Sequence, residues 1–155
     1  MKNALFLAAA VFLFGCKSQN KIVDPIEIAP TESFVDLAML KTLPLSLVSV
    51  SIDNKVYLLE ETTILLNLDL ENLSYSGKSG CNSFFGSIDL IEESRLYVNV
   101  GGMTEMMCEA ATMEWEKRFL NTLMETEFIV SEFNGTFIFT NEDATKVLNF
   151  NKIEK

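Results

Sequence analysis

Residues 127–140 have the sequence EFIVSEFNGTFIFT, and this stretch decides the fold class. Two apolar-rich runs flank Asn134-Gly135, and Asn-Gly suits the positive φ angles of a two-residue type I′ turn. The stretch therefore predicts a β-hairpin formed by residues Glu127–Phe133 and Thr136–Thr140.

Strand-like patterning extends outward from this hairpin in both directions. Toward the C-terminus, residues 141–145 predict a turn and Lys146–Phe150 a last strand. The segment Phe34–Lys41 fits either a short helical turn or an edge strand. The other predicted strands are Leu45–Ile52, Lys55–Leu59, Ile64–Glu71, Leu73–Ser76, Phe84–Leu90 and Arg95–Val100.

Residues Glu109–Thr126 interrupt this pattern with apolar residues at helical spacing. The fold class predicted is α+β and mostly β: a curved antiparallel sheet or open barrel covered by one amphipathic helix. The apolar positions of the helix are Met113, Trp115, Phe119, Leu120, Leu123 and Met124, with Glu114, Lys117, Arg118, Asn121 and Glu125 largely opposite.

The N-terminus carries one lysine, Lys2, followed by the uncharged run Ala4–Gly15 and an abrupt polar break after Cys16. This run fits the hydrophobic region of a signal peptide and is too short to span a bilayer. Leu13-Phe14-Gly15-Cys16 resembles the lipobox of bacterial lipoproteins. The resemblance implies that residues 1–15 are a signal peptide and that Cys16 is the lipid-modified first residue. The alternatives are an ordinary secretory signal and a buried helix.

Residues 16–40 are expected to form the lipidated N-terminus and a tether, because Pro25 and Pro30 favour extended chain. Residues 41–155 then form a single domain. The membrane is the expected partner, through the lipid. By the lipoprotein sorting pattern, Lys17 in place of an aspartate favours the outer membrane over the inner membrane of the cell envelope.

Composition excludes several classes of function. Removal of residues 1–15 takes one lysine and no acid, which leaves 11 basic and 22 acidic side chains and a net charge of −11. This charge argues against nucleic-acid binding, which relies on Lys and Arg. The chain has no histidine, so Ser-His-Asp and Cys-His catalysis and histidine-ligated zinc are excluded. We expect no catalytic residues, no metal and no cofactor.

With Cys16 lipidated, Cys81 and Cys108 remain. In an oxidising compartment two cysteines suggest one disulfide, which would stabilise the domain by roughly 3 kcal/mol. Two buried free thiols are the alternative, because sequence alone does not place the Cα atoms within bonding range.

Two short motifs resemble the META domain, the family of HslJ-like heat-shock lipoproteins. Gly80-Cys81-Asn82-Ser83-Phe84-Phe85-Gly86 is similar to its G-C-N-x-F-x-G motif, and Thr104-Glu105-Met106-Met107-Cys108 to its T-x-M-x-C motif. The helix and the last hairpin follow in the same order. Either a small polar site or hydrogen bonds to backbone at turns would account for Asn82 and Thr104, and we expect the second. The motif positions expected to be structural are Gly80, Asn82, Phe84, Gly86, Thr104 and Met106.

The resemblance implies a role in stress response or envelope integrity without an agreed activity. The chain departs from the family pattern at Leu45-Ser46-Leu47, where members often carry Trp, and at Glu105, where Arg is common. The leading hypothesis is a non-enzymatic envelope lipoprotein that binds or braces a partner. A carrier or sensor of a small apolar ligand inside the barrel-like sheet is the second, and an enzyme with a carboxylate pair is the third.

Three further patterns suggest ligand chemistry, and the sequence favours a structural explanation for each. Gly77-Lys78-Ser79 resembles the end of a P-loop but lacks its first glycine and its helix. Acidic residues such as Asp69 and Glu71 lack the spacing of a calcium loop. The methionines near Cys108 would suit Cu(I), but methionine more often fills irregular gaps in a core.

Overall fold

The computed structural model describes residues 33–37, 40–60 and 62–154. The predicted signal peptide, Cys16 and the tether up to residue 32 lie outside the described residues. The elements are β1 Ser33–Phe34, β2 Thr42–Ile52, β3 Lys55–Leu58, β4 Leu65–Asp69, β5 Ser74–Lys78, β6 Ser83–Glu92, β7 Arg95–Val98, β8 Gly102–Met103, α1 Ala110–Leu123, β9 Thr126–Phe133, β10 Thr136–Thr140 and β11 Lys146–Lys152.

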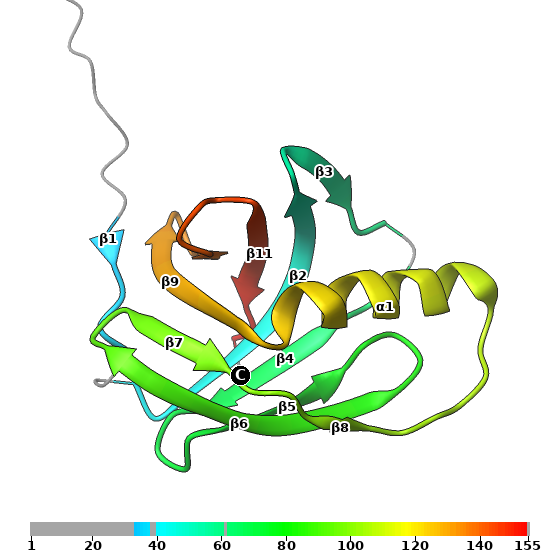
Figure 1. Cartoon of the computed structure of the whole chain (residues 1–155), viewed down its shortest axis with the longest axis horizontal. Helices are drawn as coiled ribbons and strands as arrows, with labels where there is room; N and C mark the ends of the chain where they lie inside the picture. Colours follow the sequence, from blue (N-terminus) through cyan, green and yellow to red (C-terminus); the bar gives the residue numbers. More distant parts are fainter. Residues whose placement is uncertain (1–32, 38–39, 61, 155) are drawn as a thin grey trace, which may run out of the picture.

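Eight of these strands form a closed antiparallel barrel in the order β9-β10-β11-β2-β4-β5-β6-β7 (Figure 1). The barrel closes where β7 pairs with β9, from Arg95 opposite Ile129 to Val98 opposite Thr126. The prediction of a mostly β domain with one helix is confirmed. The sheet is closed rather than open, because this last pairing removes both free edges of the ladder.

The turns predicted from Asn and Gly have the expected backbone conformation. Asn134 and Gly135 have φ angles of 51° and 81°, as a type I′ turn requires. Asp53 and Asn54, at the tip of the β2–β3 hairpin, have φ angles of 49° and 64°. Both hairpins therefore follow from local sequence.

Three short strands extend the barrel. β3 pairs with the second half of β2, and β8 pairs with β6 beside the barrel. β1 pairs with the end of β9, with Ser33 opposite Glu132. Leu37 is fully buried, and its N–H donates to the carbonyl of Glu93 at 2.7 Å. Within the described residues, Phe34 thus lies in an edge pairing and Leu37 in the core, so the segment predicted as a helical turn or an edge strand contributes to both.

The barrel interior is filled by side chains. A continuous series of aromatic contacts crosses it: Tyr75–Phe84, Phe84–Phe119, Phe119–Phe150, Phe150–Phe139 and Phe139–Phe128, with ring centroids 5.1–6.4 Å apart. Gly86 faces this core, because a Cβ there would lie 2.5 Å from Cζ of Tyr75. The interior is thus a packed core, and the ligand cavity of the second hypothesis is not formed inside the barrel.

Helix α1 lies across one side of the barrel and packs on it through Phe119, Leu120 and Leu123 (Figure 1). Arg118 lies over the rings of Tyr57 and Trp115, with its Cζ 4.1 and 4.9 Å from their centroids, and so connects the helix to β3. Within the described part of the chain, no helix has the length and apolar character needed to cross a membrane.

Candidate functional site

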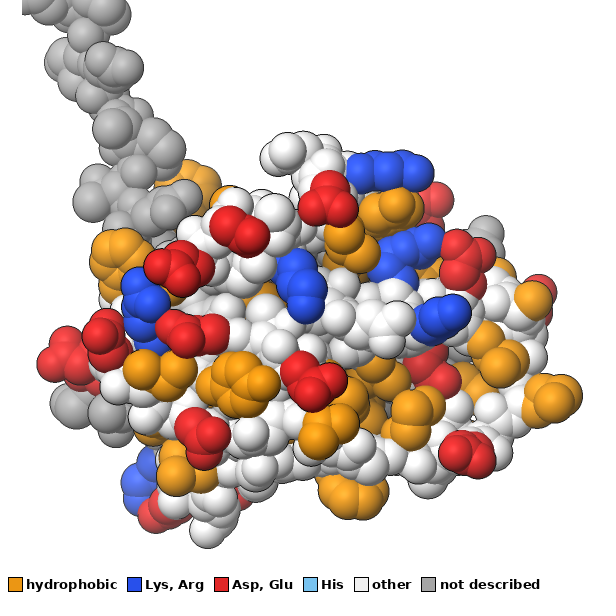
Figure 2. Space-filling model, in the orientation of Figure 1, with side chains coloured by type: hydrophobic (Ala, Val, Ile, Leu, Met, Phe, Trp, Pro, Cys, Tyr) orange, Lys and Arg blue, Asp and Glu red, His pale blue; other side chains and the backbone are white. Residues whose placement is uncertain are grey.

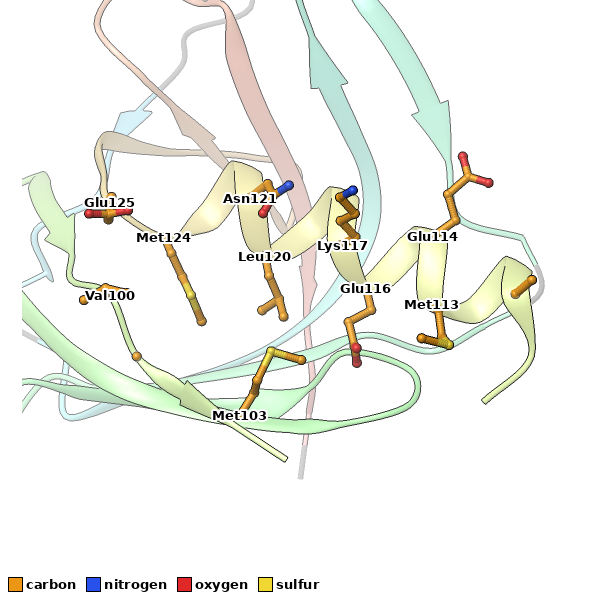
Figure 3. A pocket seen from close by; sticks show the side chains of 12 residues that line it. Val100, Met103, Met113, Glu114, Glu116, Lys117, Leu120, Asn121, Met124 and Glu125 are labelled. Atoms are coloured by element: carbon orange, nitrogen blue, oxygen red, sulfur yellow. The ribbon is translucent and has the colours of Figure 1, made fainter. Parts of the chain in front are cut away.

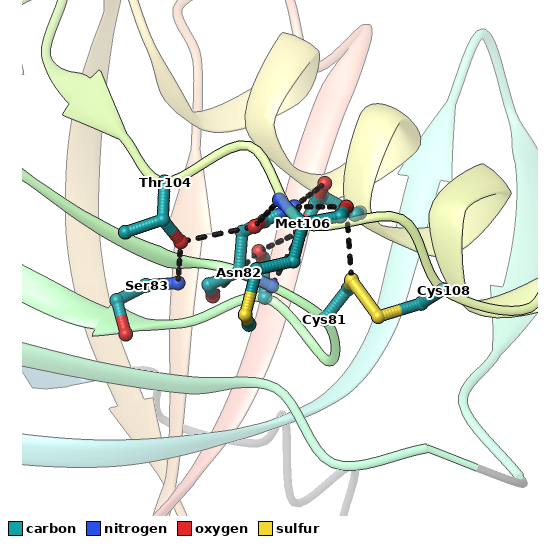
Figure 4. Close-up of a disulfide and its surroundings, with 8 residues drawn as sticks. Cys81, Asn82, Ser83, Thr104, Met106 and Cys108 are labelled. Carbon is teal, nitrogen blue, oxygen red and sulfur yellow. Dashed lines mark hydrogen bonds between the residues drawn. A yellow bond between two sulfur atoms is a disulfide. The ribbon is translucent and has the colours of Figure 1, made fainter.

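The two motifs meet at a disulfide beside α1 (Figure 4). Cys81 lies in the loop between β5 and β6, and Cys108 lies in the segment between β8 and α1. The two are bonded, with Cα atoms 6.0 Å apart. Of the alternatives that the sequence left open, the structure therefore contains the bridge. It fixes residues 104–109, which have no strand or helix of their own, against the barrel.

Asn82 holds the same segment through its buried side-chain amide. Its Oδ1 accepts hydrogen bonds from the backbone N–H of Met106 at 2.7 Å and from the hydroxyl of Thr104 at 2.9 Å. Thr104 Oγ1 in turn accepts from the N–H of Ser83 at 3.1 Å. These bonds connect the first motif to the second through Asn82 and Thr104.

Glu116 completes the cluster from the helix. This carboxylate is only 5% exposed. It accepts hydrogen bonds from the backbone N–H of Asn82 at 2.9 Å, from Nδ2 of Asn82 at 2.8 Å and from the hydroxyl of the buried Ser79. Both carboxylate oxygens are therefore used to attach α1 to the loop before β6.

The sequence analysis missed Glu116, although a signal for it exists. Glu116 lies three residues before Phe119 and four before Leu120, so it shares their face of the helix. An acid on the apolar face of an amphipathic helix has to find buried donors, because burial of an unpaired charge is costly. The Asn and Ser of the loop at residues 79–82 are the donors that it finds.

The remaining motif positions have separate roles. Gly80 has a φ angle of 96°, and a Cβ there would lie 2.8 Å from Thr62 Oγ1, so the turn requires glycine. Phe84 belongs to the aromatic core, and Met106 contributes its backbone while its side chain is exposed. The structure therefore brings together Cys81, Asn82, Thr104, Met106 and Cys108, and places Phe84 and Gly86 in the barrel wall.

Two of the alternative chemistries, the P-loop and the calcium site, find no support in the geometry. Ser79, which ends the P-loop-like stretch, is buried and donates to Glu116. Asp69 is occupied by Asn72, whose side-chain and backbone hydrogen bonds lower the pKa of that carboxyl. Across residues 33–37, 40–60 and 62–154, no three His, Cys, Asp or Glu side chains gather in a way that would hold a metal ion.

A groove of about 860 Å³ runs along α1, outside the barrel core (Figure 3). The residues around β8, namely Val100, Gly101 and Met103, form its other wall. Met103, Leu120 and Met124 point into the space between the two walls, and the carboxylate of Glu116 lies toward the Met113 end. Its size lies within the 300–1,000 Å³ typical of ligand sites, and its lining is largely apolar.

Exposed apolar side chains also occur outside the lining of the groove. Figure 2 shows hydrophobic side chains over this side of the molecule. Met107 is 93% exposed, and Met103 and Met113 are each 40% exposed. The methionines expected as core filler around Cys108 are therefore largely on the surface. Exposed apolar surface of this kind with a polar surround is typical of an interaction site.

Comparisons with known proteins agree with the fold. The sequence model of the META domain family matches residues 47–154 of this chain. The solution structure of a protein from Burkholderia xenovorans superposes with a TM-score of 0.66 at 20% identity, over 87% of this chain and 99% of that one. A second NMR structure gives a TM-score of 0.54 at 21% identity, over 76% and 94% of the respective chains. These two likenesses concern the fold alone. No curated protein matches the chain.

Proposed function

The chain belongs to the META domain family, and on that basis we propose that it is a non-enzymatic binding protein of the bacterial envelope. A lipid on Cys16 holds it at the outer membrane, and the domain binds the apolar part of a partner. The complex contributes to envelope integrity under stress. The observation that carries the binding role is the apolar groove between α1 and β8, which is open to solvent while the barrel interior is filled.

The absence of enzymatic activity is part of this proposal. The chain has no histidine, which removes the commonest general base. The buried carboxylate nearest the groove, Glu116, already accepts three hydrogen bonds, so a structural role accounts for it. A binding role needs only shape and apolar area, and the groove provides both.

The anchor is tested by Cys16→Ser. Lipid attachment requires the cysteine sulfur, and each buried CH₂ of an acyl chain contributes about 0.8 kcal/mol to membrane binding. We expect the wild-type protein in the membrane fraction and the variant in the soluble fraction of disrupted cells, by immunoblotting. Retention of the variant in the membrane fraction would show that a different signal anchors the chain.

The groove is tested by the double substitution Met103→Gln and Met113→Gln. Both side chains line the groove and neither is buried in the core, so the domain should still fold. With Nile red as an apolar probe, we expect the bound fluorescence to fall at least about threefold, because the substitutions make the walls polar. In a deletion strain, this variant should restore detergent resistance less well than the wild type.

A matched control is Val56→Gln with Leu58→Gln, since both side chains are exposed on β3 and neither lines the groove. This variant should bind Nile red and restore resistance like the wild type. If the two double variants behaved alike in both assays, the groove would not be the binding site.

A further inference from the structure

We propose that the partner segment held in the groove is a basic amphipathic helix of another protein. This inference rests on the proposed binding function and names the chemistry of the partner. It follows from three properties of the groove: its length, its methionine surface and the charge at its edges.

The groove is elongated along α1. It runs from Met113, near the start of the helix, to Met124, directly after its last residue. At 1.5 Å per residue these positions are about 16 Å apart along the axis, the length of three helical turns. A second helix of three turns laid beside α1 presents apolar residues at i, i+3, i+4 and i+7, and these fill a groove of this length.

The walls of the groove and the segment that joins them carry four exposed methionines. Met103 and Met113 line the groove, and Met106 and Met107 are exposed in the segment that joins its two walls. Methionine is unbranched and polarizable, so such surfaces adapt to the varied side chains of a helix face. A helix of three turns presents several different apolar side chains at once, which an adaptable methionine surface accommodates.

The charges around the groove favour a basic partner. Glu105, Glu109, Glu114 and Glu125 are exposed at its edges or in the segment that joins its walls. Glu114 is paired with Arg118 at 2.6 Å. The three remaining carboxylates outnumber Lys117, the one lysine among the described residues of the groove lining, and the chain as a whole has a net charge of −10. Complementary charge steers association and sets the preferred partner.

The test uses the mature chain with Cys16→Ser and two synthetic peptides of about 14 residues. Both carry leucine on one helical face, and the other face carries lysine in one peptide and glutamate in the other. By titration calorimetry we expect the lysine peptide to bind at least about tenfold more tightly. We also expect its affinity to fall as salt is raised, because exposed charges are screened.

Two variants locate the binding. Met103→Gln with Met113→Gln should lower the affinity for the lysine peptide at least about tenfold. Glu105→Lys with Glu125→Lys should reduce or reverse the preference for lysine over glutamate. The control Glu93→Lys with Glu154→Lys makes the same change in net charge at exposed sites that do not line the groove, and the preference should remain.

The outcomes separate this inference from the proposed function. If neither peptide binds but Nile red binding depends on Met103 and Met113 and decanoate displaces the dye, the groove takes a small acyl ligand. The helix proposal then fails while the binding function stands. If the glutamate peptide binds equally well, or if the control variant changes the preference as much, charge complementarity is wrong. If the groove variants change neither dye nor peptide binding, both proposals fail.

Discussion

Replacement of Glu116 by alanine is expected to lower the free energy of unfolding by about 3–4 kcal/mol. The substitution removes an acceptor that Ser79 and two groups of Asn82 share. The backbone N–H of Asn82 loses its partner, while the Ser79 hydroxyl keeps the carbonyl of Asn82 at 3.0 Å and Nδ2 of Asn82 keeps the carbonyl of Met106 at 3.5 Å. A hydrogen bond to a charged group contributes about 1.5–3 kcal/mol, and each unsatisfied buried group costs about 1–3 kcal/mol, with partial relaxation reducing the total. Urea denaturation followed by circular dichroism measures the difference.

Glu116→Gln should cost less, about 1–2 kcal/mol. One oxygen of the glutamine can still accept from Ser79 and the backbone of Asn82. The NH₂ group of the glutamine then faces Nδ2 of Asn82, so two donors meet. Rotating the Asn82 amide by 180° would not help, because its NH₂ group would then face the N–H of Met106. The glutamine therefore keeps the shape of the site and loses one acceptor.

Glu114→Ala is the matched control on the same helix. The Glu114 side chain is 71% exposed, and its ion pair with Arg118 is a surface pair. Such pairs contribute about 0–1 kcal/mol, so stability should hardly change. If Glu116→Ala and Glu114→Ala differed by less than about 1 kcal/mol, the carboxylate of Glu116 would not be holding the cluster together.

Removal of the disulfide by Cys81→Ala with Cys108→Ala is expected to cost about 3–3.5 kcal/mol. The two cysteines are 27 residues apart in sequence, and a bridge over a loop of this length restricts the unfolded chain by about this amount. Urea denaturation of the variant measures the loss. Reduction of the wild-type protein should cause a similar loss, whereas a reductant should leave the variant unchanged.

A loss below about 1 kcal/mol would mean that Asn82 alone fixes residues 104–109. This amide already holds Thr104 and Met106, so the two constraints act on the same segment. Combining Cys81→Ala and Cys108→Ala with Asn82→Ala should therefore give a non-additive loss, as expected for groups that share one structural unit.

Local sequence was sufficient for the turns and for most strands. Asn134-Gly135 and Asp53-Asn54 adopt positive φ angles because these residue types accept that conformation at low cost. The helix was predicted from its apolar spacing and differs by one to three residues at its ends. These elements are determined by residues close to one another in sequence, so a local sequence pattern is enough to predict them.

The closure of the barrel was not predictable in the same way. The pairing of Arg95–Val98 with Thr126–Ile129 joins strands that the helix separates in sequence. No local pattern specifies such a partner. β8 was missed because Gly102–Met103 has two residues, too few to show alternation.

The candidate site was predicted only in part. The motifs led to the disulfide, which the structure contains, and to Asn82 and Thr104, which hydrogen-bond to each other beside it. The groove was not foreseen, since methionines on a surface and methionines in a core have the same spacing in sequence. Their position depends on the path of residues 100–109, which the disulfide and Asn82 determine.

The pairing of β2 with β11 has a consequence for the order in which the protein folds. It joins the first long strand to the last one, with Leu45 opposite Lys152 and Ile52 opposite Lys146. Residues 146–152 leave a ribosome after all the other strands of the barrel, so the barrel cannot close before they have emerged. A chain of this topology therefore stays open until β11 is available, and the barrel closes only after synthesis of that strand.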